Sequence, residues 1–116
     1  MSRKNQIRKQ VAVKPISLKL LRTVPFEKGF HFYSSIGNYT GITATSLSEF
    51  ALKLQTISTE SITFHFRRKD FQNWIKYTIG DAALAGRISN AKQGQSAEDL
   101  RKEIIEIVEA RTARSL

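Results

Sequence analysis

The spacing of apolar residues changes once along this chain of 116 residues. Before position 44, short runs alternate apolar and polar side chains, which is the two-residue period of a strand with one buried face. After position 44, apolar residues recur every three or four positions, as on a helix with one buried face. We therefore expect a single compact domain that is mostly α, with about four to five helices and a small N-terminal β-hairpin or three-stranded element.

The expected β element has a first strand and a hairpin. Residues 16–21 follow Pro15 and alternate apolar with polar side chains, which predicts the strand. Residues 30–33 and 39–43 are rich in aromatic and β-branched side chains and flank the turn at 36–38, which predicts the hairpin.

Alternation along the hairpin separates two faces. Phe30 and Phe32 share one face, which we expect to be buried. The other face carries the candidates for an exposed aromatic surface, although such residues are also common as cross-strand packing pairs: His31, Tyr33 and Tyr39.

Capping signals mark where the helices begin. Ser46 and Glu49 form a capping box, and Asp70, Asp81 and Ser96 are placed to cap three later helices. The side chains expected to face the core are Leu47, Phe50, Ala51 and Leu54, then Phe71, Trp74, Ile75 and Ile79, then Leu84, Ala85 and Ile88, and finally Leu100, Ile104, Ile107 and Val108.

Residues 58–67 fit two patterns. Their alternation is that of a strand, whereas Ile62, His65 and Phe66 would share one helical face. We favour a helix, because the segment starts with a cap-like serine and is followed by three cations at 67–69, which suit a helix C-terminus.

Positive charge is concentrated at the N-terminus. The whole chain has a net charge of +9, of which residues 1–24 contribute +7 and the remaining 92 residues only +2. We expect 1–24 to be a basic arm, disordered over about the first 14 residues, and 25–116 to be an α-rich globular domain. The arm has no acidic residue, and its basic residues are Arg3, Lys4, Arg8, Lys9, Lys14, Lys19 and Arg22.

An acid-free basic arm is suited to contacting the phosphates of nucleic acid. The main hypothesis is a non-enzymatic binding module whose basic arm contacts a polyanionic partner through those seven residues. The partner is RNA, such as ribosomal RNA, or another polyanion within a ribonucleoprotein complex. DNA is less favoured. The alternative reading of the arm is a solvated tail that aids solubility.

A second hypothesis concerns the residues around position 65. His65, Arg67 and Arg68 could bind an anionic metabolite in a ligand-sensing or regulatory domain. Catalysis is less favoured, because Asp70 is expected to cap a helix and would then not contact His65. Trp74 could stack on a base, but a small domain needs such a residue in its core.

Several function classes are excluded by composition. The chain has no cysteine and two histidines, which argues against a disulfide framework, a thiol nucleophile and a zinc site. It has no phosphate-binding loop and no dinucleotide fingerprint. No apolar run approaches the ~18 residues of a membrane span. We expect no cofactor and no bound metal.

A series of short motifs runs through the chain: Phe30-His31-Phe32, Tyr39-Thr40-Gly41, Ser46-Leu47-x-Glu49-Phe50, Ser61-Ile62-x-Phe64-His65, Arg67-x-x-Asp70-Phe71-x-x-Trp74-Ile75 and Gly80-Asp81-x-x-Leu84-Ala85. Over residues 26–112 this series resembles a family of small, functionally uncharacterised prokaryotic domains, largely archaeal. That family often has Arg-Gly-Asp-Phe where this chain has Lys69 in place of the glycine. The resemblance implies a cytoplasmic prokaryotic protein and no particular activity.

Overall fold

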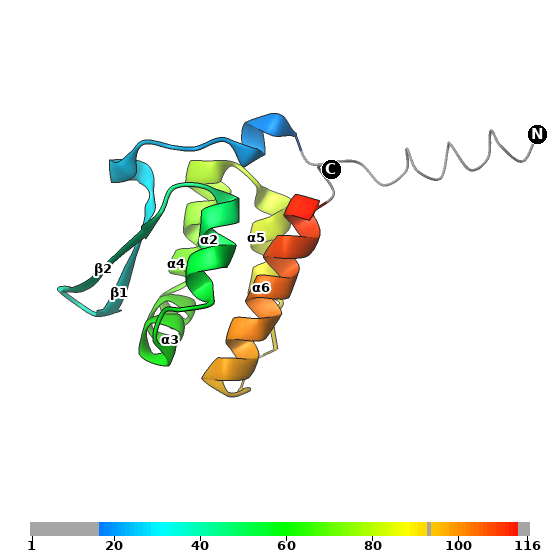
Figure 1. Cartoon of the computed structure of the whole chain (residues 1–116). Helices are drawn as coiled ribbons and strands as arrows, with labels where there is room; N and C mark the ends of the chain where they lie inside the picture. Colours follow the sequence, from blue (N-terminus) through cyan, green and yellow to red (C-terminus); the bar gives the residue numbers. More distant parts are fainter. Residues whose placement is uncertain (1–16, 93, 114–116) are drawn as a thin grey trace, which may run out of the picture.

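A β-hairpin lies across one side of a group of helices in the computed structural model, which describes residues 17–92 and 94–113 (Figure 1). This confirms the predicted mostly α fold with an N-terminal hairpin. The elements are the 3-10 helices η1 (Leu18–Leu21) and η2 (Phe26–Lys28), the strands β1 (Phe30–Ser35) and β2 (Asn38–Ala44), the α-helices α2 (Leu47–Leu54), α3 (Thr59–Arg68), α4 (Asp70–Asn73), α5 (Ala82–Ser89) and α6 (Ala97–Ala113), and the π-helix η3 (Trp74–Ile79).

The core lies between the hairpin and the helices. β1 pairs antiparallel with β2 and packs against α3, while α6 packs against α2, α3 and α5. Phe30 and Phe32 are buried, as their alternation predicts, and their rings contact Phe50 of α2. The helical positions expected in the core are also buried, except that Ile107 is only partly covered.

The strand expected at residues 16–21 is wrong. Residues Leu18–Leu21 form η1, whose first turn is capped by the hydroxyl of Ser17, which accepts from the amide of Lys19. A serine that bonds to a nearby amide stabilises a turn in place of an extended chain. The alternation also misleads, since Leu18 is 80% exposed while Leu20 and Leu21 pack against the core.

Three of the predicted caps stabilise helices as expected, including Ser96, whose hydroxyl accepts from the amide of Asp99 at the start of α6. The hydroxyl of Ser46 accepts from the amide of Glu49, and the Glu49 carboxylate accepts from the amide and hydroxyl of Thr45. Buried Asp81 accepts from the amide of Leu84 at the start of α5 and also binds Arg111 of α6 through two hydrogen bonds. Asp81 therefore joins two helices as well as capping one.

Residues 58–67, which fitted two patterns, belong to a helix. The Ser58 hydroxyl accepts from the amide of Ser61 and caps α3. Lys69 ends α3 in the left-handed conformation, at φ 64°, and α4 starts at the next residue. This conformation is unfavourable for a residue with a Cβ and costs glycine little. Glycine at this position would relieve that strain.

We expect Lys69→Gly to be more stable than Lys69→Ala by about 1 kcal/mol, because both variants lose the same charge and only alanine keeps the strained Cβ. Urea unfolding of the two variants measures the difference. Equal midpoints and slopes would contradict a left-handed residue 69.

Candidate nucleic-acid interface

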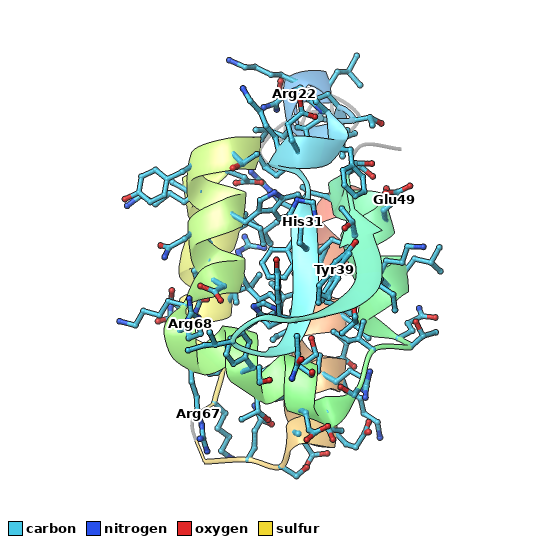
Figure 2. The ribbon with its side chains drawn as sticks, turned by 90° about the vertical axis from the view of Figure 1, so that its left-hand side faces the viewer. Arg22, His31, Tyr39, Glu49, Arg67 and Arg68 are labelled. Atoms are coloured by element: carbon cyan, nitrogen blue, oxygen red, sulfur yellow. The ribbon has the colours of Figure 1, made fainter. Side chains whose placement is uncertain are left out.

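A row of aromatic rings runs from η2 onto the outer face of the hairpin, where Figure 2 labels His31 and Tyr39. Phe26 of η2 contacts His31 at 5.1 Å between ring centroids, His31 contacts Tyr39 at 5.9 Å, and Tyr39 contacts Tyr33 at 5.5 Å. Phe26 is 62% exposed and Tyr39 43% exposed. We call these four residues the aromatic row.

Thr43 of β2 holds the centre of the aromatic row. Its hydroxyl is 2.7 Å from Nδ1 of His31 and also hydrogen bonds with the hydroxyl of Tyr39. The two rings therefore have fixed positions on the strand surface. Fixed rings lose little conformational entropy when a flat ligand stacks on them.

His65 lies beneath the hairpin, and both of its ring nitrogens are occupied. The backbone amide of Tyr33 is 2.8 Å from Nε2, and Nδ1 is 2.9 Å from Oδ2 of Asp70. An amide can only donate, so Nε2 accepts and the single proton of the neutral ring lies on Nδ1, from which it is donated to Asp70.

Asp70 does not cap its helix. Its Oδ2 accepts from His65 and from Nε of Arg68 at 3.0 Å, whereas backbone amides were the expected partners. The expectation that Asp70 would not contact His65 is therefore wrong. The left-handed Lys69 reverses the chain between the two helices and brings Asp70 back toward the end of α3.

Burial lowers the pKa of His65 below its usual value, and the charge of Arg68 adds to this, while the hydrogen bond and charge of Asp70 oppose it. Protonation would also give the ring its second N–H, on Nε2, which could then no longer accept from the amide of Tyr33. A neutral ring whose two nitrogens are both bonded inside the protein is suited to joining elements, and it has no free nitrogen to move a proton for a substrate.

Arg67 and Arg68 share one cavity, but Arg67 does not line the cavity that contains His65. Arg68 lines a cavity of about 370 Å³ together with His65, and its guanidinium lies 4.9 Å from the centroid of the Phe64 ring. Arg67 is absent from the lining of that cavity and meets Arg68 only in a neighbouring one of about 600 Å³ that also contains Thr63. The three residues of the second hypothesis therefore do not form a single site.

Phe71 and Trp74 belong to the core. Phe71 is fully buried, and Trp74 is buried with its indole N–H donating to the carbonyl of Lys28 at 2.9 Å. Neither ring is placed to stack on a base, as the size of the domain predicts.

The basic residues expected to contact nucleic acid are only partly described. Arg3, Lys4, Arg8, Lys9 and Lys14 lie outside the described residues, as does the expected disorder of the arm. Lys19 is exposed. Arg22 donates to the carbonyls of Thr78 and Ile79 at 2.8 and 3.0 Å, so its guanidinium joins η1 to the end of η3.

Sequence reasoning missed two residues of this region, Phe26 and Phe64. Phe26 lies one turn before the hairpin and gave no periodic signal. Phe64 and Arg68 are spaced i and i+4 on one helix, a spacing at which an aromatic ring and a cation meet, and this signal could have identified the pair.

The described residues contain no group of three or more histidine, aspartate or glutamate side chains that could hold a metal ion. None of the helices in residues 17–92 and 94–113 has both the length and the apolar character that a membrane span requires. Comparison with protein-family models, with curated proteins and with solved structures finds no match to this chain.

We expect the free energy of unfolding to fall as the pH drops below about 6.5, because the unfolded chain then takes up a proton on His65 that the folded chain does not. The slope due to this residue is at most about 1.4 kcal/mol per pH unit. Urea unfolding at pH 7.5 and 5.5 measures it.

The matched control for this pH dependence is His31→Gln, which should keep the slope, whereas His65→Gln should remove it. A slope that disappears in the His31 variant and persists in the His65 variant would show that the pH dependence of unfolding comes from His31 and would contradict the prediction.

Proposed function

We propose that this protein is a non-enzymatic module that binds single-stranded nucleic acid, RNA in preference to DNA. The aromatic row stacks on bases, and the basic residues of 1–24 contact phosphates, except Arg22, whose guanidinium donates to backbone carbonyls. The observation that carries the proposal is the row itself: four rings in successive contact, one on η2 and three on the outer face of the hairpin. Stacking on exposed rings is how many proteins bind single strands without reading sequence.

Charge supports the same proposal. Residues 1–24 contribute +7 and contain no acid to repel a phosphate. The nearby Lys28 of η2 is exposed and lies at the same end of the hairpin as Phe26. Since a single strand presents bases on one side and phosphates on the other, rings flanked by cations match both of its faces.

The arrangement of these groups also fits a strand that crosses the hairpin. In Figure 2, Arg22 marks one end of the visible face, His31 and Tyr39 lie along its middle, and Arg68 and Arg67 lie toward the other end. A nucleic-acid strand that leaves the basic segment near η1 would pass over the aromatic row and reach these arginines. A ribonucleoprotein particle is a natural setting for such a contact.

We expect full-length protein to bind a 12-nucleotide RNA with an affinity that falls as salt rises. Changing Arg3, Lys4, Arg8, Lys9 and Lys14 together to Gln should reduce the slope of log affinity against log salt by up to about 3.5, which is 0.7 for each lost phosphate contact. Fluorescence anisotropy measures the slope for the unmodified protein and for the variant. Salt concentrations from about 50 to about 300 mM span physiological ionic strength. Equal slopes would contradict phosphate contacts by this segment.

We expect Tyr39→Leu to weaken RNA binding by roughly tenfold, because leucine is apolar but offers no flat ring for stacking. Tyr77→Leu is the control, since Tyr77 is 72% exposed on η3 and does not belong to the aromatic row. Anisotropy titrations at one salt concentration compare the two. The same loss in both variants would argue against a specific role for the row.

A further inference from the structure

The cavity of about 370 Å³ lies between β1 and the junction of α3 with α4. His31 and Tyr33 of the aromatic row line it, so it adjoins the proposed stacking surface. Phe64 contributes a further ring on the side of α3. Pockets for small ligands measure about 300–1,000 Å³, and this one has the size and aromatic walls that suit one flat ring.

The polar groups of this cavity differ in how many further hydrogen bonds they can form. Both nitrogens of His65 are occupied, so the ring offers no further hydrogen bond. Asp70 uses only Oδ2, and its Oδ1 accepts no hydrogen bond from the described residues, although the side chain is 27% exposed. Arg68 uses Nε toward Asp70 and is half exposed, which leaves its terminal nitrogens as donors.

We infer that this cavity holds one unstacked nucleobase and favours a base with an exocyclic amino group, which donates to Oδ1 of Asp70. The inference rests on the proposed binding of single-stranded nucleic acid and adds base preference to it. A carboxylate accepts from an amino group and repels a carbonyl oxygen at the same place. The terminal N–H groups of Arg68 can meet the ring nitrogen or carbonyl beside that amino group.

Cytosine and uracil provide a clean comparison, because cytosine has an amino group where uracil has a carbonyl oxygen. Hydrogen bonds to a charged group are stronger than neutral ones, so we expect a 12-nucleotide oligo(C) to bind about tenfold more tightly than oligo(U) of the same length. Oligo(C) built from N4,N4-dimethylcytidine has lost the donor and should bind no better than oligo(U). This test uses the unmodified protein.

Asp70→Asn tests the same contact from the side of the protein. The amide oxygen can accept from His65 and Arg68 as Oδ2 does, and the amide nitrogen then lies where Oδ1 was and can only donate. We expect this variant to bind oligo(U) at least as tightly as oligo(C). Glu60→Gln is the matched control, since Glu60 lines the neighbouring cavity and its neutralisation should keep the preference for oligo(C).

The outcomes separate the inference from the proposed function. Salt-dependent binding with equal affinity for oligo(C), dimethylated oligo(C) and oligo(U) would overturn the base preference and leave the proposed function standing. No binding of any of these oligonucleotides at low salt would overturn both. Cytidine monophosphate that binds as tightly as oligo(C) would identify a site for a free nucleotide and overturn the inference of a base held within a strand.

Discussion

The hydrogen bond from the amide of Tyr33 to Nε2 of His65 determines how the two parts of this structure fit together. A two-stranded hairpin is marginally stable alone and must pack against something else. Here its apolar face packs on the helices through Phe30 and Phe32. A buried polar bond adds a requirement that apolar packing lacks, because a shift of β1 by one residue would leave both partners without a bond. The bond therefore sets where β1 lies on α3.

Asp70 extends this constraint to the next helix. It accepts hydrogen bonds from Nδ1–H of His65 and from Nε–H of Arg68, so one carboxylate joins the end of α3 to the start of α4. The conformation of Lys69 makes this possible, since a left-handed residue turns the chain sharply between the helices. His65, Arg68 and Asp70 also form the polar wall of the proposed base pocket. The stability of the fold and the binding of a base would then depend on the same contacts.

Helix positions could be predicted from the sequence because their signals are local. Ser46 and Asp81 bond to amides three residues away, and apolar spacing of three and four residues shows which side is buried. Residues 16–21 were mispredicted because five alternating positions carry little information beside one serine cap. The role of Asp70 could not be predicted, since it depends on a backbone angle at Lys69 that a lysine does not favour.

Long-range contacts also change what the net charge means. Arg22 donates to carbonyls 56 and 57 positions away, and Arg101 donates to the carbonyls of Leu54, the last residue of α2, and of Ile57. Arg111 is paired with buried Asp81. These three guanidinium groups stabilise the ends of helices, and counting them as charge available to a polyanion overstates the attraction. Nothing in a single sequence separates such arginines from free ones.

The position of His65 also affects whether copies of this protein can join to one another. The side of β1 that faces away from β2 has no neighbouring strand in the described structure, and unpaired strand groups of this kind are templates for intermolecular sheets. The amide of Tyr33 would be one of the donors for such a sheet, and His65 already occupies it. His65 therefore withdraws one edge donor of β1 from pairing with a strand of another chain.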